Sequence, residues 1–203
     1  MRVYVESNYL LEIVRQQEQS EPALDLLALA RTRQLELAVP SFSLAETYWT
    51  LRKDSDKRKG YLGALSEEMS QLRRSSDRGH IAATADRLIE ELRTVEFEEP
   101  LALDELVTEL CRIGRGLSLD AEVVRGAAGI AVQTALTMQD AFVLSSILRD
   151  LAGNPPHGPC AFVSRDRKAF GNSLVVGRLQ ESNCTYIPTF DDTLAFVRAR
   201  LVP

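Results

Sequence analysis

Residues 3–11 read Val3-Tyr4-Val5-Glu6-Ser7-Asn8-Tyr9-Leu10-Leu11, and this stretch decides how the fold begins. The β-branched and aromatic residues at positions 3–5 favour a short strand. Ser7 and Asn8 are turn or helix-cap residues, and leucines then recur at helical spacing. The stretch therefore predicts a strand that passes directly into a helix, with Glu6 at the junction.

The succession of a strand and a helix is repeated along the chain. Residues 35–39 (LELAV) and 161–164 (AFVS) predict further strands, and residues 185–187 (TYI) predict a last one. Helical spacing fills the segments between them, and Gly114-Arg115-Gly116 is expected to be a turn between two helices. Strands that alternate with helices predict an α/β fold, in which a parallel sheet is covered by helices on both faces.

A charged segment at about residues 53–99 interrupts this pattern. Basic residues gather at 52–59 and 73–78, while sparse apolar residues keep a period near 3.6. We expect helices with a break near 77–79, ended by Pro100 and inserted into a single domain of residues 1–203. The two basic clusters have two explanations, namely contacts to phosphates and a solvated helix face that also carries acids.

Composition excludes several classes of protein. The net charge is −5, and 45% of the residues are hydrophobic, which is typical of a folded globular protein and not of a basic nucleic-acid coat. The three cysteines, Cys111, Cys160 and Cys184, are far apart, so neither a zinc site nor a disulfide framework is expected. With no signal peptide and no apolar run of about 20 residues, a cytoplasmic protein without a membrane span is expected.

Four acidic residues lie at element junctions. Glu6 and Asp166 follow predicted strands, while Glu46 and Asp140 lie near the starts of helices. Ligands of open α/β sheets bind in the crevice beyond the carboxyl ends of the strands, so the four side chains can share one pocket. Oxygen ligands with few histidines or cysteines suit Mg²⁺ or Mn²⁺, which stabilise a phosphodiester during its displacement.

Helix capping is an alternative role for two of these acids. The segments ending at Glu46 and Asp140 both match the capping box, with Ser43 and Thr137 at the first position, and Thr189-Phe190-Asp191-Asp192 matches it as well. Capping would turn each acid back onto its own helix. The order and number of the four acids favour a shared site, and the direction of each side chain discriminates between the two roles.

Together these segments resemble the PIN-domain family. That family opens with a strand ending in Asp-x-Asn, which residues 3–11 match except at the acid, where Glu6 stands. Its second acid follows the second strand, as in residues 40–47 (PSFSLAET). Its third begins an apolar helix, as in 137–144 (TMQDAFVL), and its fourth follows a strand, as in 162–170 (FVSRDRKAF). The resemblance covers roughly residues 1–52 and 118–190.

This resemblance implies a three-layer α/β/α sandwich and an Mg²⁺- or Mn²⁺-dependent endoribonuclease. Glu6, Glu46, Asp140 and Asp166 would hold the metal and orient the attacking water, supported by Asn8 and Ser164. Arg165, Arg167 and Lys168, which flank Asp166, would contact the RNA. A toxin of a toxin–antitoxin pair, with an antitoxin-like partner, and an RNA-processing nuclease both fit, and a homodimer is compatible with either.

Two alternatives stay open. The first is a catalytically weakened PIN-like module that binds RNA or a protein partner. It follows from Glu6, whose side chain places the carboxylate about 1.5 Å from where an aspartate would place it. A nucleotide-binding α/β protein is the second. It lacks support, since no glycine-rich phosphate loop follows a predicted strand.

Overall fold

The computed structural model describes residues 1–75 and 77–201. They form two compact units. The sheet unit comprises Met1–Thr47 and the chain from Glu105 onwards, and the hairpin unit comprises Tyr48–Asp104. Each unit is described by itself below.

The sheet unit contains a five-stranded, all-parallel sheet in the order β3-β2-β1-β4-β5. The strands are β1 (Arg2–Tyr4), β2 (Glu36–Pro40), β3 (Arg115–Leu117), β4 (Cys160–Val163) and β5 (Cys184–Ile187). The predicted α/β class and the strands near residues 3–5, 35–39, 161–164 and 185–187 are confirmed, with shifts of one residue at their ends.

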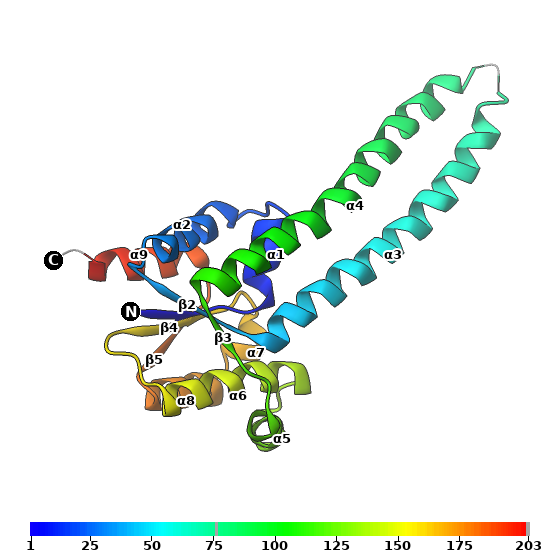
Figure 1. Ribbon diagram of the computed structural model, residues 1–203. Helices are drawn as coiled ribbons and strands as arrows, with labels where there is room; N and C mark the ends of the chain where they lie inside the picture. The colour runs from blue at the N-terminus through cyan, green and yellow to red at the C-terminus, as the bar shows by residue number, and fades with distance from the viewer. Residues whose placement is uncertain (76, 202–203) are drawn as a thin grey trace. The chain divides into compact units, whose positions relative to one another are not determined.

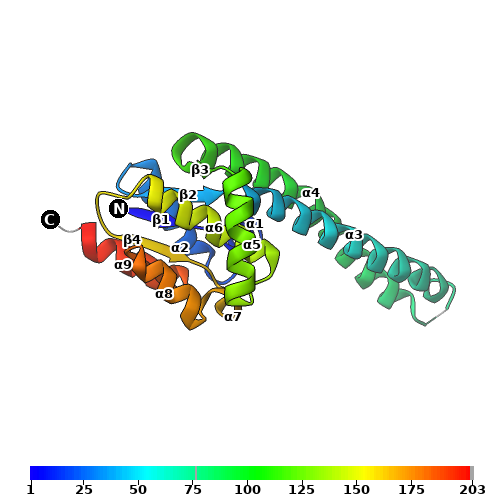
Figure 2. The same ribbon diagram turned by 90° about the horizontal axis from the view of Figure 1, so that it is seen from below.

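Helices cover both faces of this sheet (Figure 1). On one face lie α1 (Ser7–Val14), α2 (Ser20–Arg31) and α9 (Phe190–Leu201). On the other lie α5 (Ala121–Thr134), α6 (Met138–Gly153) and α8 (Ser173–Glu181), which Figure 2 shows from below. The short α7 (Arg167–Phe170) follows β4. The central strands β1 and β4 are buried along their whole length, as expected of parallel strands that are covered on both faces.

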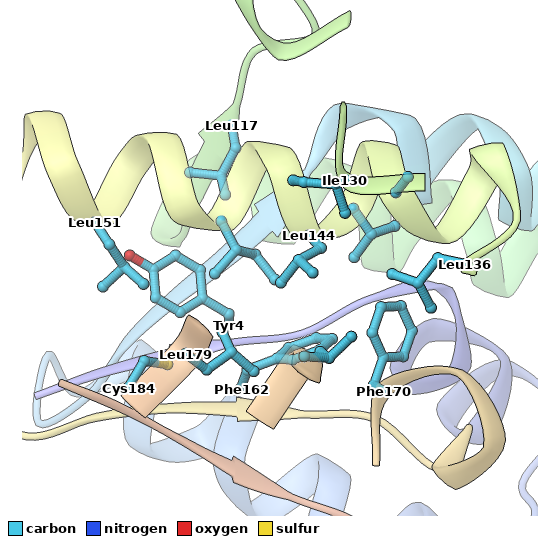
Figure 3. Close-up of a cluster of buried hydrophobic side chains, with 14 of the residues drawn as sticks. Tyr4, Leu117, Ile130, Leu136, Leu144, Leu151, Phe162, Phe170, Leu179 and Cys184 are labelled. Atoms are coloured by element: carbon cyan, nitrogen blue, oxygen red, sulfur yellow. The ribbon is translucent and has the colours of Figure 1, made fainter. Parts of the chain in front are cut away.

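Alternate residues of the strands fill the core on the α6 side. Tyr4 and Phe162 point from β1 and β4 into a buried cluster with Leu144 of α6 (Figure 3). Phe170 of α7 joins it, and its ring meets that of Phe162 edge-on at 5.0 Å between centroids. Such a cluster fixes the register of β1 against β4, because a slip of one residue would turn these rings to the other face.

A buried ion-pair network closes the amino-terminal edge of the sheet. Asp150 of α6 accepts hydrogen bonds from Arg2 Nη1 at 2.8 Å, from the Tyr4 hydroxyl at 2.8 Å and from Arg115 Nε at 3.0 Å. Arg2 also donates to Glu36 at 2.8 Å. The network connects β1, β2 and β3 to α6. The charged side chains at the starts of these strands are therefore paired with opposite charges and not buried without a partner.

The predicted turn at residues 114–116 is wrong. Arg115–Leu117 is strand β3, which pairs with β2. Gly114 permits this entry, since a Cβ at that position would stand 2.9 Å from the Leu110 carbonyl oxygen and 3.0 Å from that of Leu37. The strand forms because β2 offers a free edge, and this long-range cause leaves no apolar alternation in the local sequence.

The hairpin unit consists of two long helices. Most of α3 (Ser41–Leu72) and of α4 (Gly79–Ile113) belongs to it, and within it they run side by side in opposite directions (Figures 1 and 2). Leu62 and Met69 of α3, with Ala82 and Ile89 of α4, are buried and lie seven residues apart on each helix, which is the heptad spacing of a two-helix seam. Described residues 53–99 are thus mostly helical, and none of them forms a strand.

Polar contacts join the two helices. Ser55 Oγ lies 2.5 Å from Glu96 Oε1, and Arg58 Nη2 lies 3.2 Å from Glu99 Oε2. The expectation that Pro100 ends this helical region is wrong, because α4 continues through it. A proline costs a helix one backbone hydrogen bond and a steric clash, and the packing of α4 on both sides of Pro100 outweighs this local cost.

Candidate functional site

Two of the predicted acids follow neighbouring strands. Tyr4 of β1 pairs with Phe162 of β4, so Glu6 and Ser164 lie at equivalent positions just beyond the two strands. Ser164 Oγ donates to Glu6 Oε1 at 2.9 Å, and both side chains are buried. The structure therefore brings the first predicted acid and its predicted supporting serine into direct contact at the carboxyl edge of the sheet.

Glu6 is also the N-cap of α1. Its Oε2 accepts hydrogen bonds from the Ser7 hydroxyl at 2.7 Å and from the Asn8 backbone N–H at 3.0 Å. Burial raises the pKa of Glu6 above its ordinary range, and the hydrogen bonds from Asn8, Ser7 and Ser164 offset part of this rise. Asn8, the second predicted supporting residue, thus acts on Glu6 through both its backbone and its side chain.

Glu46 lies near the start of α3, which follows β2 without a break. It is half-buried, and its burial raises the pKa of the carboxyl, with further increases from the charges of Glu6 and Asp140. A hydrogen bond with Ser7 lowers this pKa. The capping alternative fails here, because α3 begins at Ser41 and the buried Ser43 Oγ has no hydrogen-bond partner among the described residues.

Asp140 lies in the first turn of α6 and does take part in a cap. Thr137 Oγ1 donates to Asp140 Oδ2 at 2.6 Å and accepts from the Asp140 backbone N–H at 3.2 Å. Burial nevertheless raises the pKa of Asp140, the Thr137 hydrogen bond lowers it, and the charge of Asp166 raises it further. Asp140 therefore serves the cap and lies within electrostatic reach of Asp166 at the same time.

Asp166 is exposed and caps the four-residue α7. Its Oδ1 accepts from the Ala169 backbone N–H at 2.8 Å, and its own backbone N–H donates to Ser164 Oγ at 3.1 Å. Ser164 is therefore a shared support, because it donates to Glu6 and accepts from Asp166 with one hydroxyl. The cap engages only one carboxylate oxygen of Asp166.

The four carboxylates form one electrostatically coupled group. Glu46 senses Glu6 and Asp140, and Asp140 senses Asp166. In the described part of the chain, none of the four pairs with a lysine or arginine, so their mutual repulsion is not neutralised by the protein. Within residues 1–75 and 77–201, however, no three acids, histidines or cysteines lie close enough to hold one metal ion.

Two further residues of the site were not predicted from the sequence. Ser7 donates its hydroxyl proton to Glu6 and also lowers the pKa of Glu46. Tyr186 of β5 donates its hydroxyl to the Ser164 carbonyl at 2.9 Å. Burial raises the pKa of Tyr186 to about 12, with Arg167 lowering it and Asp166 and Glu6 raising it. Ser7 was detectable as a hydroxyl beside Glu6, whereas nothing local marked Tyr186.

The basic residues around Asp166 differ in their surroundings. Arg165 is tied to the buried Glu12, with 2.5 Å between Nη1 and Oε2, and also pairs with Glu18. Arg167 and Lys168 are exposed. The Arg165 guanidinium is therefore already engaged within the fold, and the two following side chains are the accessible cations beside the acids.

Comparison of the chain with protein-family models finds no match, and comparison with curated proteins finds none either. Of the helices described, none is by itself long and apolar enough to cross a membrane; α5 and α6 reach that length only as a pair, bent by 117°.

Proposed function

We propose that this chain is a PIN-type, Mg²⁺- or Mn²⁺-dependent endoribonuclease. The observation that supports the proposal best is the coupled group of Glu6, Glu46, Asp140 and Asp166 at the carboxyl edge of a parallel sheet. Carboxylates that repel one another and form no ion pair with a protein cation are stabilised by a bound divalent cation. The sequence resemblance to PIN domains agrees with the order of these acids along the chain.

The donor set fits a hard divalent cation, because every candidate ligand is an oxygen. Glu46, Asp140 and Asp166 each keep oxygen available, while Glu6 already accepts three hydrogen bonds. The first three are therefore the candidate ligands, and they would have to approach one another to share one ion, since no three ligands converge in the described residues. Glu6 would keep the edge of the site negative. When bound, such an ion stabilises the charge of the phosphodiester and lowers the pKa of bound water.

The protein's own groups supply the remaining chemistry. Glu46 is half-buried and its pKa is raised, which suits a carboxylate that accepts a proton from an attacking water. Ser7 holds Glu6 by a hydrogen bond and lowers the pKa of Glu46, so it acts on both glutamates. Ser164 fixes Glu6 and the backbone of Asp166, so that two acids from different loops keep a constant separation.

A binding module without catalytic activity is the second candidate. It is favoured by the three donors that occupy Glu6, and by the finding that no three potential ligands of the described residues converge at metal-binding distance. Such a module would use the same edge to bind RNA or a protein partner. It would neither cleave RNA nor respond to a divalent cation.

A metal titration separates the two candidates. Purified protein is mixed with a fluorescent RNA of mixed sequence, and cleavage is followed as Mn²⁺ or Mg²⁺ is added, with a chelator as the control. In parallel, the melting temperature is measured over the same titration, because an ion that binds the folded state raises it. Cleavage and a melting shift with either ion support the nuclease. Absence of both with both ions rejects it.

A further inference from the structure

The hairpin unit carries an exposed aromatic and basic patch that the carboxylate site does not use. Trp49 of α3 is 59% exposed, and the Lys53 ammonium lies 5.0 Å from the centroid of its ring. With Arg52 and Lys57 these residues form the tryptophan patch. They line an open hollow of about 520 Å³ together with one acid, Asp56.

Two cations of this patch form no ion pair with any described residue, unlike the next basic residues along α3. In the described chain, Arg52 and Lys53 have no acidic partner, and Lys57 approaches Asp54 only at 3.6 Å on the surface. By contrast, Arg58 and Lys59 are paired with Glu99 and Glu96 of α4. The tryptophan patch therefore combines uncommitted positive charge with an accessible indole face.

We propose that the tryptophan patch binds single-stranded RNA, with a base stacked on Trp49 and the adjoining phosphates on Arg52, Lys53 and Lys57. This rests on the proposed ribonuclease function, which supplies RNA as the substrate. Aromatic side chains stack on unpaired bases of any sequence, and nearby cations follow the phosphates. Three cations against the two carboxylates of Asp54 and Asp56 leave a net positive patch, which complements a polyanion. A base paired inside a duplex cannot offer its face to an indole.

The position of the chain's only tryptophan makes the proposal directly measurable. The full chain carrying Asp140→Asn, which is not expected to cut RNA, is titrated with a ten-nucleotide single-stranded RNA while Trp49 emission is recorded. A stacked base should quench this emission in a saturable way, and the same RNA annealed to its complement should quench it much less.

Variants then assign the binding energy to individual residues, with labelled RNA followed by fluorescence anisotropy. Trp49→Ala should weaken binding by roughly 5- to 150-fold, while Trp49→Phe should keep most of it. Arg52→Glu and Lys53→Glu should weaken it and reduce its salt dependence by about 0.7 in the log–log slope for each lost phosphate contact. Arg87→Glu, on an exposed part of α4, reverses an equal charge elsewhere in the unit and should leave binding nearly unchanged.

Several outcomes would overturn the proposal. Unchanged Trp49 emission at an RNA concentration that saturates anisotropy would place the RNA elsewhere. Equal losses of RNA affinity in Arg52→Glu and Arg87→Glu would show that binding depends only on the net charge of the protein. Equal quenching of Trp49 by polyglutamate would show that the patch binds any polyanion. If the wild type cleaves no RNA with either metal but Trp49 is still quenched and the variants behave as stated, the nuclease proposal fails and the RNA-binding patch stands.

Discussion

Ser164 and Glu6 are 158 residues apart in the chain, yet the serine hydroxyl donates to the glutamate carboxylate at 2.9 Å. The parallel pairing of β1 with β4 creates this contact, because it aligns the residues that follow the two strands. The same hydroxyl accepts from the Asp166 backbone at 3.1 Å. One buried hydroxyl therefore fixes two of the four acids, and its removal is a sharp test of how the site is held.

Ser164→Ala should lower the free energy of unfolding by about 2 kcal/mol, because buried polar groups that lose a partner cost about 1–3 kcal/mol. Urea denaturation at neutral pH measures this. Ser70→Ala is the control, since the exposed Ser70 hydroxyl donates only to the Ser66 carbonyl of its own helix and should contribute under about 0.5 kcal/mol. Equal small losses in both variants would mean that the Ser164 contacts contribute nothing to stability.

Glu6 should make the stability depend on pH with a definite sign. Its pKa is raised in the folded state by burial, so the folded protein holds this proton more tightly than the unfolded chain does. The proton is released on unfolding, and the contribution of Glu6 to stability falls as the pH rises through the folded pKa. Glu6→Gln removes this dependence. The stability of Glu6→Gln relative to the wild type should therefore increase between about pH 5 and about pH 8.

Denaturation of both proteins in matched buffers across this range measures that difference. Only its slope is predicted, since the introduced amide also changes one acceptor into a donor and shifts the absolute stability. A difference that stays flat with pH, or that decreases as the pH rises, would contradict a raised pKa at Glu6.

Asp140→Asn should abolish the response to Mn²⁺ while leaving the fold intact. Asparagine keeps the size of the side chain, and loss of the charge relieves the burial penalty and the repulsion from Asp166, which both raise the pKa of Asp140. The melting temperature without metal should therefore be equal to that of the wild type or higher. Cleavage should fall by more than about 100-fold, beyond the range seen for residues that only support a metal ligand.

Asp192→Asn is a closely matched control for this experiment. Thr189 Oγ1 donates to Asp192 Oδ2 at 2.6 Å and accepts from its backbone N–H at 3.1 Å, which reproduces the Thr137–Asp140 cap at the start of α9. Asp192→Asn should keep the full Mn²⁺ shift and full cleavage. If both variants lose equally little, Asp140 is a cap and not a ligand.

The network at the opposite edge of the sheet should matter for stability alone. Asp150→Ala removes the buried carboxylate that Arg2, Tyr4 and Arg115 share, leaves Arg2 with only the partly exposed Glu36, and should cost about 3–5 kcal/mol. Tyr4→Phe removes one hydrogen bond to the same carboxylate and should cost only about 1–2 kcal/mol. Chemical denaturation measures both losses. Similar losses in the two variants would show that Arg2 finds another partner when Asp150 is removed.

The sequence predicted those parts of the fold that local patterns determine. The apolar runs around Val3 and Phe162 belong to strands buried on both faces, and this burial leaves a direct trace in composition. Strand β3 left no such trace, because its pairing with β2 is a long-range event. At Pro100 a local rule gave the wrong answer, since packing along α4 outweighs one missing hydrogen bond.

The candidate site was predictable to a similar degree. Element junctions placed Glu6 and Asp166 at the same edge, because parallel strands end on the same side. Whether an acid caps its helix depends on where the helix begins, and so Glu46 and Asp140 differ despite matching motifs. Tyr186 reaches the site only through the position of β5 in the sheet, which no motif encodes.

Glycine substitutions should have opposite signs in the two units. Gly60 and Gly63 lie inside α3, and an added Cβ at either position would meet nothing within 4 Å, so alanine adds no clash there. Alanine is favoured over glycine in helix interiors by about 0.8–1.0 kcal/mol, so each change to alanine should stabilise α3 by about that amount.

At Gly114 the same methyl group would meet two backbone carbonyl oxygens at 2.9 and 3.0 Å. Gly114→Ala should therefore destabilise the entry into β3, by about 1–3 kcal/mol. Circular dichroism melts of the three variants, each compared with the wild type, test both signs. A loss of stability in Gly60→Ala and Gly63→Ala would show that their outer helix face is covered in solution, and a neutral Gly114→Ala would show that the backbone between α4 and β3 yields without cost.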